Sequence, residues 1–494
     1  MYKKIITLCL LFVGYLCHFA KAQESVTKEY HEQYRPQVHF SPKAHWMNDP
    51  NGMVYFKGIY HLFFQYYPNG STWGPMHWGH ATTKDLVHWK ELPIALYPDS
   101  LGYIFSGSAV VDSNNTSGFG KNGKSPLVAI FTSHDPKAEK AGSVNTENES
   151  LAYSLDNGVT WTKYAGNPVL KNPGIRDFRD PKVMWYAKEK KWVMTLATKD
   201  HITFYSSPDL KNWKKESEFG KEIGAHGGVW ECPDLFPLTL NGKTYWVLIV
   251  NLNPGGPNGG SATQYFIGQF DGNRFSSIDD QTRWLDYGPD EYAGVTWGNT
   301  GNRRIFLGWM ANWAYTQQVP TTKWRNAMTI PRELALFESN GIIYVGSTPV
   351  KELFLLLEKP VKEKASTKSK RLSGQYLMRV SANTGSDFSI TLSNKSGEKL
   401  IIGYDKAKDQ YFIDRAKSGR VDFAESFSKV AYAPRFSKEV NSQLLLVVDR
   451  STVELFADGG KTVMTGVFFP STPYDDFTLK SAKATQLTPL NPIW

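Results

Sequence analysis

The stretch Asp156-Asn157-Gly158-Val159-Thr160-Trp161 decides the fold, because versions of it recur along the chain. An aspartate opens a tight turn and a tryptophan closes it in Asp85–Trp89 and again in Asp209–Trp213. Asp271–Phe275 is a weaker fourth copy. The copies are separated by about 50–70 residues, which is typical of repeated sheet units with loop insertions. Repetition of one hairpin in this way predicts a β-propeller.

Short apolar runs cut by Gly, Pro, Asn and Asp fill the chain from about Val38 to Tyr344. They have the length of strands, and no long helical periodicity separates them. About 300 residues at about 60 per unit predict about five blades, within the usual range for propellers. The clearest runs are Met53–Phe56, Tyr60–Phe64, Leu127–Phe131, Val193–Ala197, Tyr245–Val250 and Ile305–Trp309.

The pattern changes after Pro331–Leu334. Residues 351–371 begin with a short helix or strand and become rich in Lys, Glu and Ser, so we expect a linker there. Alternating segments then predict a β-sandwich. We therefore expect an all-β protein, with a five-bladed β-propeller catalytic domain over residues 35–350 and a C-terminal β-sandwich of structural or accessory role over residues 372–494. The sandwich segments are Tyr376–Val380, Phe388–Leu392, Leu400–Tyr404, Tyr411–Asp414, Leu444–Val448 and Val453–Phe456.

Residues 1–22 have the features of an export signal peptide. Two lysines precede the apolar run Ile5–Leu16, and a small-residue cleavage site ends at Ala22. The run is too short for a permanent membrane anchor. We expect an exported protein, periplasmic or extracellular. A lipid anchor on Cys17 is the alternative, against which the bulky Leu16 before it argues.

Composition narrows the class of partner. The net charge of +9 is spread along the chain, except for a basic cluster at Lys359–Arg371 that lacks aromatic residues and favours a solvated linker over a nucleic-acid surface. After removal of the leader, Cys232 is the only cysteine, so no internal disulfide is expected. The histidines show no metal-ligand spacing, and no glycine loop with a lysine would hold a phosphate. We expect a monomer with no metal, cofactor, nucleic acid or membrane span.

The stretch Trp46-Met47-Asn48-Asp49-Pro50-Asn51-Gly52 carries the first candidate functional residue, Asp49. Its last four residues have the local signature of a tight turn, since proline presets φ and Asn-Gly supplies positive φ. An indole and a second amide directly before a solvated turn are unusual. They favour a cleft that holds a ligand with both an apolar face and hydroxyl groups.

Two further acids stand in distinctive contexts. Asp180 follows Arg179, whose guanidinium favours the ionised carboxylate. Glu231 lies between Trp230 and Cys232, where poor solvation raises the pKa and keeps the proton on. Taken one at a time, Asp180 would also fit a structural salt bridge, and Glu231 would also fit a strand end without a catalytic role. Together with Asp49 they fall on different blades, whose inner loops converge on the axis, and glycosidic bonds are usually cut by two carboxyl groups.

The chain resembles glycoside hydrolase family 32, the invertase, inulinase and levanase family of β-fructofuranosidases. Three stretches carry the resemblance in the order that the family has them: Trp46–Gly52, Phe178–Pro181 and Trp230–Asp234. The likeness extends from about Arg35 to the C-terminus, and the family fold is a five-bladed propeller followed by a β-sandwich. Further matches are Phe63–Pro68, Trp78–Ala81, Phe105–Ser108, Trp324–Met328, Pro331–Leu334, Asp449–Phe456 and Thr462–Pro470.

The resemblance implies a role for each acid: Asp49 as nucleophile, Glu231 as acid/base and Asp180 as transition-state stabiliser. A covalent fructosyl-enzyme means retention, and predicts carboxyl groups of Asp49 and Glu231 about 5–5.5 Å apart. The family's usual Asp-Phe-Tyr-Ala is replaced by Asp290-Glu291-Tyr292-Ala293, which leaves the role of Tyr292 open. The implied substrate-binding residues are Asn48, Gln65, Ser106 and Arg179 for hydroxyl groups and Trp73, Phe105 and Trp313 for aromatic walls, with Trp309 close in sequence to Trp313.

The resemblance implies hydrolysis of levan, inulin or sucrose, and we favour exo action that releases fructose. The preference for β-2,1 or β-2,6 linkages stays open. Endo action, fructosyl transfer and non-catalytic fructan binding are alternatives. Ser154–Trp161 also fits the Asp-box S-x-D-x-G-x-T-W of sialidase propellers, but that box is a structural hairpin far from the chemistry.

Overall fold

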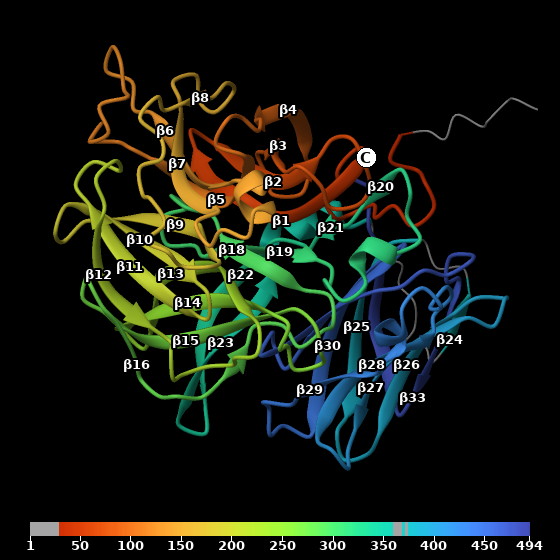
Figure 1. Cartoon of the computed structure of the whole chain (residues 1–494). Coiled ribbons are helices and arrows are strands. Elements are labelled where there is room, and N and C mark those ends of the chain that lie inside the picture. Colours follow the sequence, from red (N-terminus) through yellow and green to blue (C-terminus); the bar gives the residue numbers. More distant parts are fainter. Residues whose placement is uncertain (1–28, 359–367, 371–373) are drawn as a thin grey trace, which may run out of the picture.

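The computed structural model describes residues 29–358, 368–370 and 374–494 (Figure 1). The predicted leader, residues 1–22, lies outside them. Within the predicted linker, the described residues form the 3-10 helix η2 (Lys351–Leu356) and the short strand β24 (Lys368–Lys370). The fold is all-β, with a five-bladed propeller followed by a β-sandwich, as the sequence predicts. In Figure 1 the propeller runs from red to green, and the sandwich is blue.

The described residues form five antiparallel sheets around the propeller axis, each built on a four-strand meander. The first strands of the sheets, β1, β5, β9, β13 and β18, contact one another in a ring and therefore line the axis. Blade 1 consists of β1 (His45–Phe56), β2 (Ile59–Tyr67), β3 (His77–Thr83) and β4 (Lys90–Leu96). Blade 2 consists of β5 (Tyr103–Val111), β6 (Leu127–His134), β7 (Glu147–Ser154) and β8 (Thr162–Lys163). Blade 3 consists of β9 (Phe178–Tyr186), β10 (Lys191–Thr198), β11 (His201–Ser207) and β12 (Lys214–Phe219).

The last two blades carry additional short strands. β20 (Trp324–Arg325) pairs in parallel with β1, which ties the end of the propeller to its first blade. Blade 4 contains β13 (Val229–Leu240), β14 (Lys243–Asn253), β15 (Ala262–Phe270), β16 (Phe275–Ser277) and β17 (Arg283–Trp284); blade 5 contains β18 (Tyr292–Thr296), β19 (Ile305–Met310), β21 (Ala327–Met328), β22 (Arg332–Ser339) and β23 (Ile342–Pro349). The short helices of the propeller are α2 (Pro136–Lys140) and η1 (Thr316–Gln318).

The four repeated Asp turns lie at the same place in blades 1 to 4, between the third and fourth strands. In Asp156, Oδ1 accepts hydrogen bonds from the N–H groups of Val159 (3.1 Å) and Thr160 (2.9 Å). Because the side chain replaces a backbone acceptor, the turn is encoded locally. The equivalent acceptors in blades 1, 3 and 4 are Asp85, Asp209 and Asp271.

The tight turn predicted at Asp49–Gly52 is wrong. These residues lie inside β1, whose pairing with β2 shifts register between Met47 and Pro50 and again between Asn51 and Val54. Such bulges tolerate a proline without an N–H group and a glycine at φ +52°. They also bend the inner strand next to Asp49, so the polar side chain is aimed by a distorted strand and not by a loop.

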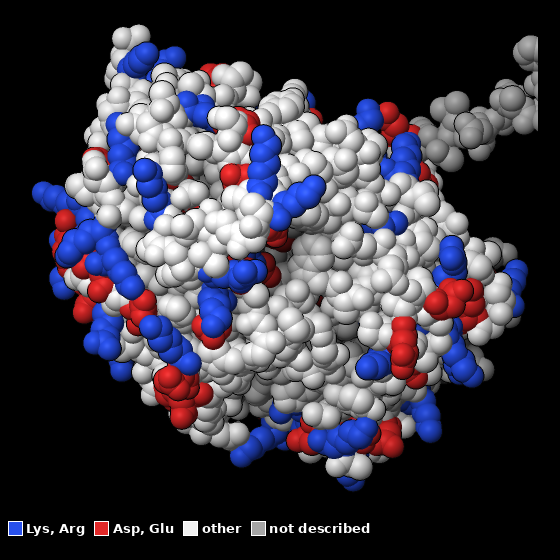
Figure 2. All heavy atoms as spheres, in the orientation of Figure 1, with Lys and Arg blue, Asp and Glu red and all other residues white. Residues whose placement is uncertain are grey.

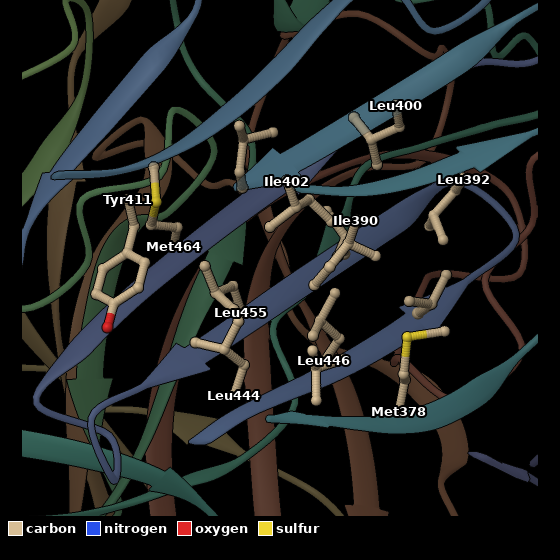
Figure 3. Packing of buried hydrophobic residues seen from close by; sticks show 14 of the residues in the cluster. Met378, Ile390, Leu392, Leu400, Ile402, Tyr411, Leu444, Leu446, Leu455 and Met464 are labelled. Atoms are coloured by element: carbon tan, nitrogen blue, oxygen red, sulfur yellow. The ribbon is translucent and has the colours of Figure 1, made fainter. Parts of the chain in front are cut away.

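The sandwich packs two sheets face to face. Apolar side chains from both sheets point toward one another in its core, as the labelled residues Ile390, Ile402, Leu446 and Leu455 show (Figure 3). The first sheet orders β24, β33 (Asp476–Lys480), β26 (Phe388–Ser393), β27 (Lys399–Asp405), β28 (Gln410–Lys417) and β29 (Ala431–Pro434); the second orders β32 (Thr462–Val467), β31 (Thr452–Ala457), β30 (Asn441–Asp449), β25 (Tyr376–Asn383) and β34 (Ala482–Pro489). The 3-10 helix η3 (Glu425–Ser428) follows β28.

The sandwich is joined to the propeller by buried charges. The Arg332 guanidinium on β22 bonds Asp286 at 2.8 Å and, through Nε, Glu454 of the sandwich at 2.9 Å. Glu454 also bonds Nε2 of His39 at 3.0 Å, while Asp449 bonds Nδ1 at 2.9 Å. All five side chains are fully buried, so separating the two domains would leave uncompensated charges. This contact supports a structural role for the sandwich.

Candidate active site

A cavity of about 380 Å³ opens at one end of the propeller axis, and all ten residues predicted for the site line it. A hollow with acidic and basic atoms at its edge is visible near the middle of the face in Figure 2. Each inner strand except β18 contributes some of these ten through residues near its beginning, and β2 and two loops carry the others. These ten residues are Asn48 and Asp49 on β1, Gln65 on β2, Phe105 and Ser106 on β5, Arg179 and Asp180 on β9, Glu231 on β13, and Trp73 and Trp313 on loops.

Asp49 is held by hydrogen bonds at both of its carboxylate oxygens. Oδ1 accepts from Nδ2 of Asn48 at 2.9 Å, and Oδ2 accepts from the Ser106 hydroxyl at 2.6 Å. Asn48 is oriented in turn by the Trp46 indole N–H, which donates to its Oδ1 at 2.7 Å. Trp46 itself is fully buried. The indole before Asp49 therefore positions the amide behind the carboxylate and does not line the cavity.

Glu231 is approached by two donors. Arg179 donates to Oε1 from Nη2 at 3.1 Å, and the Tyr292 hydroxyl donates to Oε2. Burial raises the pKa of Glu231 above its usual value and the charge of Asp49 adds to the rise, while Arg179 and Tyr292 oppose it. The direction agrees with the sequence prediction. The Trp230 indole, however, packs in the core between blades 3 and 4. The Glu231 carboxyl is therefore shielded from water by its position in the cavity and not by the neighbouring indole.

Asp180 differs from its sequence prediction in ionisation. The Arg179 guanidinium bonds Glu231, Glu147 and Asp177 rather than the neighbouring Asp180. Burial raises the pKa of Asp180 to about 8 against the lowering by Arg179, and the charges of Glu231 and Asp49 add to the rise. The expectation that Arg179 keeps Asp180 ionised is therefore wrong for the free site.

The thiol of Cys232 lies between two of the carboxyl groups. Its Sγ is 3.6 Å from Oδ2 of Asp49 and 3.6 Å from Oδ2 of Asp180, and its backbone N–H donates to Oδ2 of Asp180 at 2.9 Å. Burial and the surrounding negative charges raise the pKa of the Cys232 thiol, so it stays protonated. Both Asp180 and Cys232 have positive φ, +66° and +42°, which marks strained backbone where the acids converge.

Aromatic rings form the walls. Phe105 stacks on His134 with centroids 4.2 Å apart, and Trp73, 38% exposed, meets its edge at the rim. Trp313 lines the cavity, whereas Trp309 is fully buried, with its ring centroid 4.9 Å from that of Trp313, so only Trp313 of these two indoles reaches the cavity. The cavity thus presents apolar faces beside carboxyl and amide groups, the combination that a sugar requires.

Sequence reasoning missed several lining residues. Glu147 accepts from Arg179 at 3.1 Å and from the Phe178 N–H at 2.7 Å, and it is buried. A sequence signal for Glu147 was available: Glu147 and Glu149 occupy alternate positions of one strand, so both side chains point to the same face of the sheet. Tyr292, whose role the sequence left open, bonds Glu231. Other additional lining residues are His134, Glu139, Thr146, Arg176, Asp177 and Gln317.

Within the described part of the chain, no group of three or more His, Cys, Asp or Glu side chains is arranged to hold a metal ion. The chemistry available there is that of carboxyl groups. Two carboxyl groups on neighbouring sides of a sugar-sized cavity, with aromatic walls and amides, define a glycoside hydrolase.

Family comparison agrees with this class. The Glycosyl hydrolases family 32 N-terminal domain is matched over residues 39–346, and the family's C-terminal domain over residues 351–492. The chain therefore belongs to glycoside hydrolase family 32. It is 45% identical to a levanase of Bacillus subtilis over 100% of this chain and 76% of the relative, and 43% identical to an extracellular exo-inulinase of Aspergillus niger over 90% of each.

Solved structures show the same fold. The exo-inulinase from Aspergillus awamori superimposes with a TM-score of 0.88 at 39% identity, covering 94% of this chain and 100% of that chain. The β-fructofuranosidase from Schwanniomyces occidentalis, complexed with fructosyl-erythritol, gives a TM-score of 0.82 at 31% identity, covering 94% and 99%.

Proposed function

We propose that the protein is a retaining, exo-acting β-fructofuranosidase that releases fructose from the ends of levan or inulin and also cleaves sucrose. The observation that carries the proposal is that Asp49, Asp180 and Glu231, on three different inner strands, face one cavity. Similarity to proteins named levanase, exo-inulinase and invertase supports the choice of sugar.

Asp49 would attack the anomeric carbon of fructose. Its bonds from Asn48 and Ser106 fix both oxygens and leave the carboxylate oriented toward the cavity. Attack forms a covalent fructosyl-enzyme, which water then hydrolyses with net retention. The thiol of Cys232 adds a weak donor at Oδ2 of Asp49 and needs no ionisation to do so.

Glu231 would protonate the departing oxygen and later take a proton from water. Burial raises the pKa of Glu231 and so favours the protonated form that acts as the acid. When that proton leaves, Arg179 and Tyr292 already donate to the two oxygens and stabilise the carboxylate that forms. In the second step Glu231 acts as the base. The same two donors make it a weaker base there, because they lower the affinity of its carboxylate for the incoming proton.

Asp180 would bind fructose hydroxyl groups. Its pKa of about 8 in the free site leaves a proton to donate, or lets it accept once a bound sugar supplies hydroxyl hydrogens. Such bonds strengthen as the ring flattens toward the oxocarbenium-like transition state.

Exo action needs a blind pocket that admits a chain end, whereas endo cleavage needs an open groove. Next to Asp180 the Ser108 hydroxyl donates to the carbonyl of Pro181 at 2.8 Å and accepts from the Val183 N–H at 3.0 Å, which ties the neighbouring inner strands β5 and β9 together. This close contact of the inner strands supports a blind pocket. The selectivity between β-2,1 and β-2,6 linkages would then depend on the rim, where α2 and the loop after it contribute Glu139, Ser143 and Thr146.

The proposal is tested by a time course on levan, inulin and sucrose. Free fructose as the only early product from both polymers supports exo action, and early oligosaccharides would show endo action. Proton NMR of the first product distinguishes retention, which gives the β-anomer, from inversion. Longer fructosyl products at high sucrose would reveal transfer, a sialoside serves as the negative control, and an enzyme inert on all three fructosides would refute the proposal.

We also propose export through the predicted leader. The relative from Aspergillus niger is named extracellular, and in the described residues no helix is long and apolar enough to cross a bilayer. Mass spectrometry of the secreted protein would give Gln23 as the first residue after simple cleavage. A lipid-modified Cys17 at the N-terminus would instead support anchoring.

A further inference from the structure

A second cavity, of about 410 Å³, opens at the opposite end of the propeller axis. The same five inner strands that begin at the active site end here, with Val54, Val111, Lys182, Asp234 and Thr296 among the lining residues. Among the described residues none lines both cavities. This lower cavity is as large as the active one and within the usual range for small-ligand sites, about 300–1,000 Å³.

The lower cavity is not an extension of the active site. Ser108 and Pro181 line neither cavity and lie between the two groups of lining residues along β5 and β9, where the Ser108 hydroxyl donates to the Pro181 carbonyl. The bulged segment of β1 and the buried Asn51 separate Asp49 from Val54 in the same way. A ligand of the lower cavity must therefore enter from the opposite face of the propeller.

One buried carboxylate in the lower cavity has an acceptor to spare. Asp234 is 1% exposed, and its Oδ2 accepts from the backbone N–H and hydroxyl of Thr296 at 2.6 and 2.7 Å and pairs with Lys182 at 3.1 Å. In the part of the chain that the structure describes, no donor bonds Oδ1. Oδ1 is not among the fully buried side-chain atoms that lack a partner, so it reaches the open space of the cavity, where a ligand hydroxyl can donate to it.

The lower cavity is lined by three charged side chains. Lys182 and Asp234 form an ion pair, whereas Nη1 of Arg304 donates to the carbonyls of Gly301 and Arg303 at 2.8 and 3.0 Å and its Nε is buried without a partner. Arg304 is the one cation among the described lining residues without a carboxylate partner, so phosphate is the competing ligand that a test must include. Hydroxyl groups fit the remaining polar atoms.

Two half-buried indoles, Trp185 and Trp246, supply aromatic surface in the lower cavity. Trp185 is held by an edge contact with Trp192, with centroids 4.9 Å apart, and Trp246 by Phe270 at 5.2 Å. Fixed rings lose little entropy when a ligand stacks on them, and they match the C–H faces of a sugar.

We propose that the lower cavity is a second carbohydrate site, which takes one fructosyl residue of the polymer against Trp185 with a hydroxyl donated to Oδ1 of Asp234. The identity of the sugar rests on the proposed function. Such a site holds a polysaccharide on the face opposite the active cavity. It raises the local concentration of chain ends without altering the chemistry.

The test uses the full chain carrying Glu231→Gln, which should turn over about 10²–10⁴ times more slowly, titrated with the trisaccharide 1-kestose by calorimetry. We expect two binding events per chain. Trp185→Ala weakens one at least tenfold and leaves the other, and Trp73→Ala, at the rim of the active cavity, does the reverse. A single event, or both variants acting on the same event, overturns the second site.

Failure of the proposed function is distinguishable, because it removes the event that Trp73→Ala affects. In the active enzyme, Trp185→Ala should leave sucrose turnover within twofold and slow levan or inulin hydrolysis at low polymer concentration. Should Trp185→Ala fold poorly, crystals of the Glu231→Gln protein soaked in 1-kestose decide: sugar density beside Trp185 supports the site, and its absence there refutes it. Competition by inorganic phosphate at the second event would also overturn a neutral-sugar site.

Discussion

The hydroxyl of Tyr292 on β18 donates a hydrogen bond to Oε2 of Glu231 on β13, so two neighbouring inner strands share one proton-transfer group. Tyr292 remains protonated, because burial and the charge of Glu231 raise its pKa. A donor of this kind stabilises the carboxylate form of Glu231 and holds its pKa down.

Tyr292→Phe should therefore raise the pKa of Glu231. Loss of one hydrogen bond to a charged group corresponds to about one pH unit. The alkaline limb of the kcat/KM profile should move to higher pH by that amount, and kcat should fall because the carboxylate formed on proton transfer is less stabilised. A profile that stays in place, or shifts to lower pH, would contradict this reading of the contact.

Glu231→Gln and Asp49→Asn should differ in their response to the leaving group. Removing a general acid typically costs about 10²–10⁴ in rate. A substrate whose leaving group needs no protonation, such as β-fructofuranosyl fluoride, should recover most of the loss of kcat/KM in Glu231→Gln, because kcat/KM reports the first step, whereas kcat should stay low because hydrolysis of the fructosyl-enzyme still needs the base. Asp49→Asn should remain inactive on it. Equal rescue of both variants, or of neither, would remove the assigned roles; circular dichroism checks that both are folded.

The blades could be predicted from sequence because their turns are local. Asp156 and its three counterparts bind N–H groups only a few residues on, so each turn is visible in a short window. Blade 5 lacks a copy because Asn340 and Gly341 make its turn with positive φ. The strands missed in the sandwich, such as β33 and β34, alternate buried and exposed residues with many polar side chains and carry little hydrophobic signal.

The residues that line the site were predictable from their motifs, whereas their backbone geometry and hydrogen-bond partners were not. Asp49–Gly52 has the composition of a turn, and only pairing with β2 makes it a bulged strand. The partner choice of Arg179 likewise depends on how blades 2, 3 and 4 meet, since Glu147 and Glu231 come from different sheets. The sequence prediction for Asp180 considered only the neighbouring Arg179, whereas the raised pKa of Asp180 comes first from its burial, which only the fold reveals.

Gly52 is predicted to be intolerant of any side chain. Its φ is +52°, and a Cβ there would lie 2.6 Å from Cδ2 of Phe63 and 2.8 Å from Cζ3 of Trp78. Both rings are fully buried and cannot withdraw. Gly52→Ala should cost about 2–4 kcal/mol of unfolding free energy through strain and overpacking, and should lower kcat by displacing Asp49. Gly58→Ala is the control, since it also has positive φ but no atom within 4 Å; an equal loss in both would assign the effect to φ alone.

His39 should make the stability of the protein depend on pH in the alkaline range. Although burial alone would lower its pKa, bonds to Asp449 and Glu454 raise the pKa of His39 from 6.5 to about 9. Because the folded pKa lies above the unfolded one, this stabilisation is complete below about pH 6.5 and is lost as pH rises through about 9. The shift corresponds to about 3 kcal/mol.

Urea unfolding between pH 6 and 10 should show that decline in the wild type and a smaller one in His39→Gln, which is less stable throughout. His88→Gln, which removes an exposed ion pair with Asp85, should keep the wild-type slope. A decline of the same size in His39→Gln would place the titrating group elsewhere and would leave the junction between propeller and sandwich without its pH-sensitive contact.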